Sequence, residues 1–304
     1  MLKHTKLKNC RRLLLVSLTC ALLKGSLSAQ TPPAYQKEID HWHAERIQNL
    51  KAPDGWLNLA GLYWLEEGQN SFGSGGQNKI IFPAGTIAET EGIFERTGKT
   101  VRLIVRGNSV IKVNEQPVSE AVIFDKDSVR QPVVSSGSLR WTIIQRGDKI
   151  GIRLRNLESP LARSFGDVDR YPVDTAWRIT ATLQAAGPSR TIAISNVLGQ
   201  TSQQQTPGKL VFSIQNKQYT LDALEEGNQL FIIFADETSG KTTYPSGRFL
   251  SVKKPGEDGK TTIDFNKAYN PPCAFTDYAT CPLPPRENDL PVAVTAGEKN
   301  YNHH

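Results

Sequence analysis

The sequence predicts a mostly β protein, and two observations carry this prediction. Short runs rich in Val, Ile, Thr and aromatic residues alternate with Gly, Asn, Asp and Pro through most of the 304 residues, the pattern of successive strands. One earlier stretch carries apolar residues at helical spacing. We therefore predict an N-terminal amphipathic helix followed by two antiparallel β units (sandwich or open barrel) and a Pro-rich C-terminal loop segment.

The predicted helix lies in residues 30–55. Apolar residues recur at Ile39, Trp42, Ile47 and Leu50, and Pro53–Gly55 ends the pattern. Residues 56–157 form the first predicted β unit, residues 158–174 a connector, and residues 175–304 the second unit with the Pro-rich segment. The expected strands include Lys79–Phe82, Val101–Arg106, Val110–Val113, Leu139–Gln145, Ile150–Leu154, Ala176–Leu183, Arg190–Ile194, Lys209–Ile214, Gln218–Leu221 and Leu230–Phe234.

Residues 1–29 have the features of a secretory signal peptide. Basic residues precede an apolar run from Leu13 to Leu23, which is too short to span a bilayer. We expect cleavage after Ala29, a secreted or periplasmic mature protein, and no stable membrane insertion afterwards. Thr19 before Cys20 disfavours a lipid anchor.

The charge balance changes when this leader is removed. The leader carries six basic residues and no acidic one, so its removal lowers the net charge from +6 to near zero. The sequence pI of about 9.1 therefore does not indicate a basic nucleic-acid surface. We expect no nucleic-acid partner, and the sequence leaves the oligomeric state open.

Two cysteines, Cys273 and Cys281, remain after the leader is removed. An even pair in an exported protein predicts a disulfide. Zinc is the less favoured alternative, because the spacing suits no common zinc knuckle and no histidine lies near. Closing so short a loop contributes about 2–3 kcal/mol.

Several enzyme classes lack their residues. The chain has no G-x-S-x-G, H-E-x-x-H or C-x-x-C motif, and we expect no metal and no cofactor. His41 and His43 lie two positions apart on the helix and therefore on different faces. We interpret both as structural or solvated, with catalysis as the alternative.

Polar and aromatic residues gather near the C-terminus. An Arg with carboxylates and Tyr rings suits a small anionic or sugar-like ligand. The alternative is that Arg248 and Asp264 form a buried structural pair. The ligand-binding candidates are Arg248, Asp264, Asn266, Tyr269, Asn270, Tyr244 and Arg163.

Three functions follow as hypotheses. The first is an envelope protein that binds a small molecule or glycan beneath the Pro-rich segment. The second is a cofactor-independent hydrolase using carboxylates, such as Asp167 and Asp169, or a histidine. The third is an envelope interaction protein without a pocket. Trp56 either stacks on a sugar ring or packs in the core.

Four sequence motifs resemble an exported bacterial family known as domain of unknown function 1684. They are the segment Trp56–Leu65, the segment from Phe165 to Trp177, Thr238–Gly240 with Gly247–Phe249, and the segment from Asp264 to Pro285. The resemblance covers nearly the whole mature chain. It implies no particular reaction, so catalytic residues stay unknown.

Overall fold

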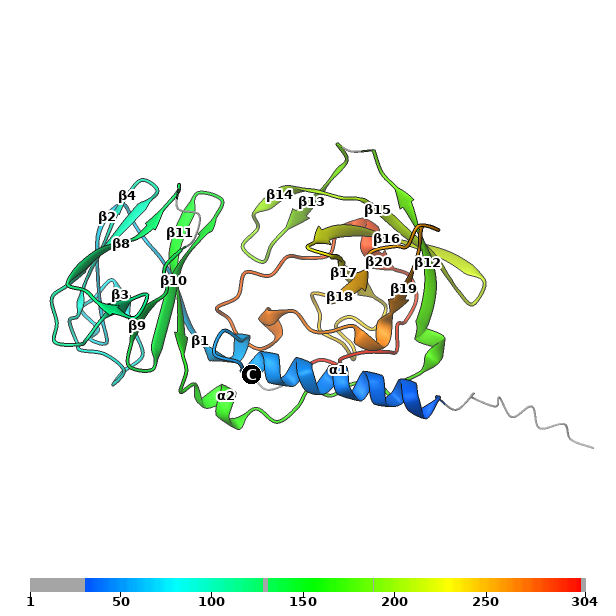
Figure 1. The fold of residues 1–304 in the computed structure, drawn as a ribbon, viewed down its shortest axis with the longest axis horizontal. Coiled ribbons are helices and arrows are strands. Elements are labelled where there is room, and N and C mark those ends of the chain that lie inside the picture. Colours follow the sequence, from blue (N-terminus) through cyan, green and yellow to red (C-terminus); the bar gives the residue numbers. More distant parts are fainter. Residues whose placement is uncertain (1–30, 128–130, 188, 302–304) are drawn as a thin grey trace, which may run out of the picture. The chain divides into compact units, whose positions relative to one another are not determined.

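The structure is a computed structural model that describes residues 31–127, 131–187 and 189–301 (Figure 1). The predicted signal peptide lies outside these residues. Helix α1 spans Pro33–Lys51 and buries Tyr35, Ile39, His43 and Leu50, which share one face at helical spacing. Pro33 is tolerated in the first turn, where its missing N–H has no helical partner.

Two antiparallel sheets form the first β unit. Alternate residues of each strand turn inward, and the sheets enclose a core that includes Phe72, Phe94 and Trp141. One sheet has the order β1 (Leu59–Trp64), β11 (Lys149–Asn156), β10 (Leu139–Arg146), β9 (Val134–Ser136), β6 (Lys112–Val113) and β7 (Gln116–Pro117). The other has the order β3 (Ile80–Ile81), β2 (Gly68–Gly73), β4 (Gly92–Thr97), β5 (Thr100–Val105) and β8 (Glu120–Asp125).

The second β unit is a nearly closed, barrel-like sheet. Its end strands β18 and β19 contact each other, and its core includes Phe212, Phe234 and Phe265. The order is β18 (Arg248–Lys253), β17 (Gln229–Asp236), β16 (Lys217–Glu226), β15 (Gly208–Ile214), β12 (Arg178–Ala185) and β19 (Lys260–Asp264), with β20 (Asp289–Leu290) beside β17. Strands β13 (Thr191–Ser195) and β14 (Thr201–Gln205) form a separate hairpin.

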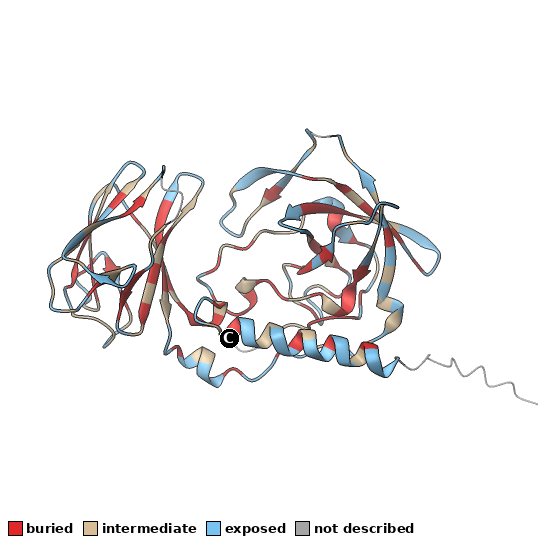
Figure 2. Ribbon diagram, viewed as in Figure 1, coloured by how far each residue is buried: buried red, intermediate tan, exposed pale blue. Residues whose placement is uncertain are grey.

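The C-terminal segment is mostly irregular and includes short 3-10 turns. They are η3 (Phe265–Lys267), η4 (Pro272–Ala274) and η5 (Arg286–Asn288). A disulfide joins Cys273 and Cys281, as the sequence predicts. Figure 2 shows buried residues recurring along this segment.

The mostly β architecture is confirmed, and the structure contains local elements that the sequence did not predict. The connector is not all loop, because Ser159 accepts a hydrogen bond from the Ala162 amide and caps a short helix, α2 (Pro160–Ser164). A 3-10 turn, η1 (Trp56–Asn58), precedes the first strand. Among the residues that the structure describes, no helix combines the length and apolar character needed to cross a membrane. Residues from Thr31 onward form one compact unit.

Candidate functional site

Arg248 lies in the interior, where it holds the C-terminal segment. Its side chain and that of Asp236 are both fully buried, and the two are joined by an Nη2–Oδ2 contact of 2.8 Å. The guanidinium also donates to the carbonyls of Val294, Ala296 and Glu298. The suggested pair of Arg248 with Asp264 is therefore wrong, because the charge of Arg248 is matched by a carboxylate on the neighbouring strand β17.

Asp264 instead bonds to helix α1. The hydroxyl of Tyr35 donates to Asp264 Oδ1 at 2.8 Å, and Asn266 Nδ2 donates to the Tyr35 hydroxyl at 3.0 Å. Burial, and then the hydrogen bond to Asp264, raise the pKa of Tyr35 above its usual range. This network ties the N-terminal helix to the end of β19.

The remaining candidates lie in other contacts. The backbone N–H of Asn270 donates to Glu298 Oε2 at 2.7 Å, and the Tyr269 ring lies under the Arg46 guanidinium at 4.7 Å. Tyr244 donates to the Cys273 carbonyl at 3.1 Å. Arg163 lies apart on α2, two-thirds exposed and 3.6 Å from Glu158. The structure thus brings six of the seven predicted residues around the C-terminal segment, while a ligand role for them stays a prediction.

His43 meets an acidic residue that the sequence did not pair with it. Its Nε2 lies 2.6 Å from Asp167 Oδ1, and its Nδ1 is buried without a partner in the described part of the chain. The other helix histidine, His41, pairs with Glu45 at 3.3 Å and is largely exposed. Because Nε2 is engaged by Asp167, His43 ties α1 to the segment after α2.

A cavity of about 190 Å³ lies beside the disulfide. Arg146 on strand β10 and Arg153 on strand β11 line this cavity, and we name it the arginine pocket. Trp56 lies at its side. Its other lining residues are Phe231, Phe249, Pro272, Ala279, Thr280, Cys281 and Pro282.

Arg153 is a buried cation without a partner. Its residue is 8% exposed, its Nε is buried and unbonded, and no carboxylate within ion-pair distance is found among residues 31–127, 131–187 and 189–301. Burial, followed by the nearby charges of Arg146 and Arg155, lowers its pKa to about 10. The guanidinium lies over the Trp56 ring at 5.5 Å, a contact that offsets only part of the cost of burial.

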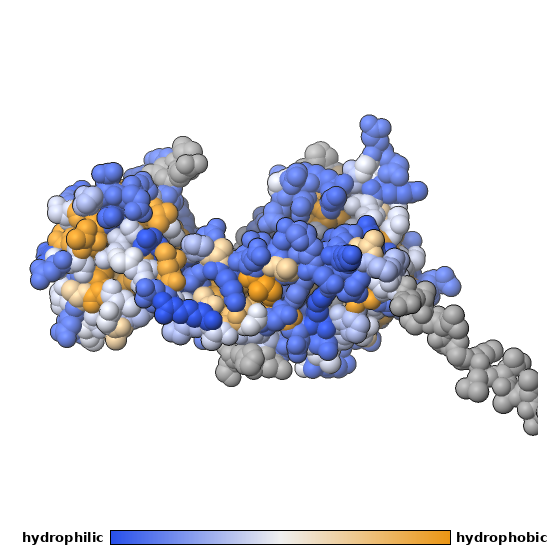
Figure 3. Space-filling view, turned by 60° about the horizontal axis from the view of Figure 1, so that its bottom comes forward, coloured by the Kyte–Doolittle hydropathy of each residue, from blue (hydrophilic) through white to orange (hydrophobic). Residues whose placement is uncertain are grey.

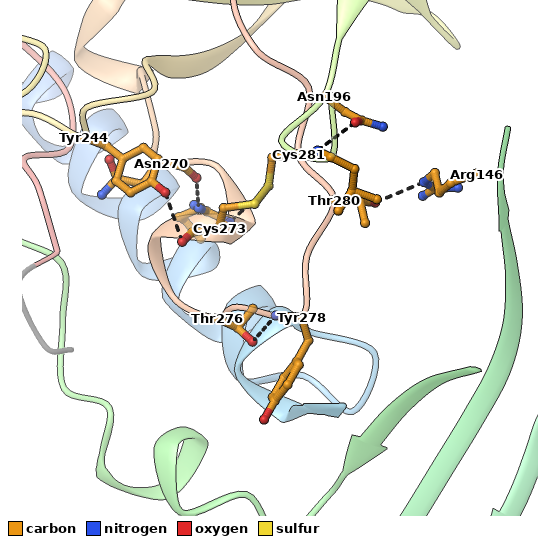
Figure 4. Close-up of a disulfide and its surroundings, with 11 residues drawn as sticks. Arg146, Asn196, Tyr244, Asn270, Cys273, Thr276, Tyr278, Thr280 and Cys281 are labelled. Atoms are coloured by element: carbon orange, nitrogen blue, oxygen red, sulfur yellow. Dashed lines mark hydrogen bonds between the residues drawn. A yellow bond between two sulfur atoms is a disulfide. The ribbon is translucent and has the colours of Figure 1, made fainter. Parts of the chain in front are cut away.

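Arg146 is held at the pocket by the disulfide loop. Its Nε donates to Thr280 Oγ1 at 3.0 Å, and Figure 4 shows the two side chains pointing toward each other. Thr280 is next to Cys281, whose bond to Cys273 fixes this wall. The second hydrogen bond of the guanidinium goes to the Gln145 carbonyl at 2.8 Å, so it meets no charge.

The residues of this site have the chemistry that an anion requires. Two guanidinium groups present donors suited to a carboxylate or phosphate, and aromatic and proline side chains form apolar walls for the rest of a ligand. Within the described ranges, no three His, Cys, Asp or Glu side chains are grouped as a metal ion would require.

The sequence contains a signal for this pocket that motif searches miss. In the hairpin of β10 and β11 every second residue faces outward, and the register pairs Arg140 with Arg155 and Arg146 with Lys149. Such like-charged neighbours are unfavourable on a sheet unless an anion lies between them. The contribution of Phe231 and Phe249 from the other β unit was not predictable from this pattern.

Comparison with known proteins gives a family match over most of the second β unit. Residues 163–299 match the family described as "Protein of unknown function (DUF1684)", which confirms the resemblance for this part of the chain. The motif Trp56–Leu65 lies outside the match. No curated protein matches the chain.

Solved structures give partial likenesses. An uncharacterized protein of Haloarcula marismortui is 29% identical, with a TM-score of 0.40, over 47% of this chain and 82% of that one. An FHA domain of FhaA, solved in complex with an intracellular protein domain, is 19% identical, with a TM-score of 0.22, over 31% of this chain and 97% of that one. Likenesses at these TM-scores carry no argument about function.

Proposed function

We propose that this protein, whose residues 163–299 match the DUF1684 family, binds a small anionic molecule in the arginine pocket. The observation that carries the proposal is the uncompensated charge of Arg153, which is 8% exposed and has no hydrogen-bond or ion-pair partner in the described chain. A buried cation left in this state costs several kcal/mol of folding free energy. A bound carboxylate or phosphate supplies the missing partner.

The pocket also suits the rest of such a ligand. Phe231 and Phe249 stand edge to face, with ring centroids 5.0 Å apart, and give a rigid apolar wall. The volume of about 190 Å³ suits a compact molecule such as a sugar acid or an aromatic acid. The Trp56 ring, half-buried at the pocket, offers a flat surface for either ligand.

The expected place of action is the cell envelope or the exterior. The leader features of residues 1–29 support this part of the proposal. A disulfide that closes one wall of the pocket agrees with an oxidising compartment. Mass spectrometry of the exported fraction tests it, with a mature chain beginning near Gln30 expected and an uncleaved leader contradicting it.

The hydrolase alternative keeps one observation in its favour, the contact of His43 Nε2 with Asp167 Oδ1. This pair is not among the residues that line the arginine pocket. It therefore gives no reason to place hydrolytic chemistry there. The hydrolase and the pocket-free interaction protein stay predictions.

Isothermal titration with four probes tests the proposal. Benzoate, acetate and inorganic phosphate carry the charge, and benzyl alcohol is the neutral match for benzoate. We expect benzoate to bind at least about tenfold more tightly than benzyl alcohol, since a charge-assisted hydrogen bond is worth about 1.5–3 kcal/mol.

The variant Arg153→Gln should lose this preference. Arg106→Gln is the matched control, because Arg106 is an exposed arginine of the first β unit outside the pocket. It should bind benzoate as the wild type does. Equal affinity of the wild type for benzoate and benzyl alcohol, or no binding of any of the three anions, contradicts the proposal.

A further inference from the structure

The outer face of the β10–β11 hairpin carries a concentration of basic residues. The register places Arg140 opposite Arg155, Thr142 opposite Arg153, Ile144 opposite Gly151 and Arg146 opposite Lys149. These eight residues share one face because side chains alternate along each strand. Five of the eight are basic and none is acidic.

These five basic residues form no ion pair within the described ranges, whereas arginines elsewhere often do. Arg96, Arg170 and Arg190 each have a carboxylate partner. On the hairpin face, Arg140 instead donates to the carbonyls of Gly137 and Leu139. Arg155 donates to the backbone carbonyl of Asp54 at 2.9 Å. No carboxylate of the described residues thus lies within ion-pair distance of this face, and the nearest negative charge is that of Asp54, which acts on the pKa of Arg155.

A second cavity, of about 330 Å³, opens on the same face. We name it the distal pocket, and it is lined by Pro53, Asp54, Val133, Arg140, Trp141, Thr142, Arg155 and Leu157. Its walls are mainly apolar, with two arginines as in the arginine pocket. Arg155 Nε is buried without a partner in the described chain, and burial lowers the pKa of this group.

The two pockets are neighbours across the strands. Thr142 lines the distal pocket and is the cross-strand partner of Arg153, which lines the arginine pocket. Arg153 and Arg155 lie two residues apart on β11, so their Cα atoms are about 6.6 Å apart. One linear molecule with two anionic groups at a similar separation reaches both arginines.

We infer that the ligand is a linear oligoanion, with one anionic group on Arg146 and Arg153 and a second on Arg140 and Arg155. This inference rests on the proposed function and names the ligand class for it. Two arginine pairs on one face, each beside an apolar wall and without an ion pair among the described residues, match a repeating acidic unit. An oligosaccharide of sugar acids and an oligophosphate share this chemistry.

A series of dicarboxylates measures the separation of the two groups. Succinate, adipate and suberate are compared with monocarboxylates of equal length by isothermal titration. We expect affinity to peak at one chain length. The best dicarboxylate should bind at least about tenfold more tightly than the monocarboxylate of equal length, because it makes one more charge-assisted contact. Equal affinities of the two series overturn it.

Substitutions on the hairpin test separately the binding of one anionic group in the arginine pocket and of a second group in the distal pocket. Arg155→Gln and Arg140→Gln should each remove most of the dicarboxylate advantage, while monocarboxylates still bind through Arg146 and Arg153. Arg153→Gln should weaken binding of both series, and Arg106→Gln should change neither. Melting temperatures confirm that each variant is folded, and Arg140→Gln keeps the test available if Arg155→Gln does not fold.

The measurements distinguish failure of the oligoanion inference from failure of the proposed function. Loss of monocarboxylate binding in Arg153→Gln, together with an unchanged dicarboxylate advantage in both Arg140→Gln and Arg155→Gln, overturns only the oligoanion inference. Insensitivity of both series to Arg153→Gln overturns the proposed function as well. Digalacturonate and tripolyphosphate then identify the source, since tighter binding of either one over its monomer supports the inference and assigns its chemistry.

Discussion

The guanidinium carbon of Arg153 lies 5.5 Å from the centre of the Trp56 ring, in a pocket where no described carboxylate pairs with it. A cation over an aromatic ring gains about 0.5–2 kcal/mol. Taking the same charge out of water costs several kcal/mol. The free protein therefore carries a net penalty at this residue, and a bound anion removes it.

Replacing Arg153 with an apolar residue should stabilise the protein in the absence of ligand. Arg153→Met keeps most of the side-chain length and removes the charge, so we expect unfolding free energy to rise by about 1–3 kcal/mol. Urea unfolding monitored by Trp fluorescence measures this. Arg102→Met, at an exposed arginine paired with Glu120, should change stability by less than about 1 kcal/mol. A loss of stability in Arg153→Met contradicts the account.

The advantage of Arg153→Met should depend on pH in one direction. Burial holds the pKa of Arg153 near 10 in the folded protein, below its value in the unfolded chain. The charged form is thus the disfavoured one when folded, so the penalty is complete below pH 10 and is relieved as the pH rises through 10. The difference in unfolding free energy between the two proteins should be constant from pH 6 to 8 and shrink above pH 10.

Removing the charge of Asp236 should destabilise the protein, whereas removing the charge of Arg153 should stabilise it. The side chains of Arg248 and Asp236 are both fully buried and paired with each other, so Asp236→Asn leaves a buried cation without its carboxylate. We expect a loss of about 3–5 kcal/mol. A melting curve measures it, with Glu120→Gln at the exposed pair with Arg102 as the control. A loss below about 1 kcal/mol shows that Arg248 finds compensation elsewhere.

Opening the disulfide should affect both stability and binding. The double variant Cys273→Ser, Cys281→Ser removes a bridge between residues eight apart in sequence, at a cost of about 2–3 kcal/mol. It also frees Thr280, which holds Arg146 at the pocket. At a low temperature where the variant is fully folded, its affinity for benzoate should still be lower than that of the wild type. Isothermal titration calorimetry at that temperature measures the affinity. Unchanged affinity shows that Arg146 is positioned by other contacts.

An interaction surface is the competing account of this protein. Figure 3 shows that, on the face displayed, hydrophobic residues lie in small groups among hydrophilic ones. Among the exposed large apolar residues, Val122 lies on β8, whereas Val110 and Leu198 lie in separate loops. Scattered apolar residues of this kind are ordinary for a protein surface.

Local patterns predicted much of the fold. Strands β10 and β11 match the predicted runs Leu139–Gln145 and Ile150–Leu154, and between them Gly147 adopts the positive φ of 55° that a tight hairpin turn favours. Strand β14 (Thr201–Gln205) was missed because all five residues are exposed and polar, so no alternation marks it. Strand β18 was missed because Arg248 points inward.

The candidate site was less predictable, because it depends on contacts distant in sequence. Arg146 and Thr280 are 134 residues apart, and Tyr35 reaches Asp264 across 229 residues. The sequence supplied the residue types around the C-terminal segment. It could not show that Arg248 is neutralised within the core while Arg153 is not.

The most direct test is an NMR titration of the arginine Nε–H groups in protein labelled with ¹⁵N-arginine. The signal of Arg153 is assigned by its absence in Arg153→Lys, and Arg248 serves as the internal control because it is fully buried. The account predicts that benzoate shifts the Arg153 and Arg146 signals saturably while Arg248 stays in place and benzyl alcohol shifts none. An Arg153 signal that benzoate, acetate and phosphate all leave unchanged would contradict anion binding in the arginine pocket.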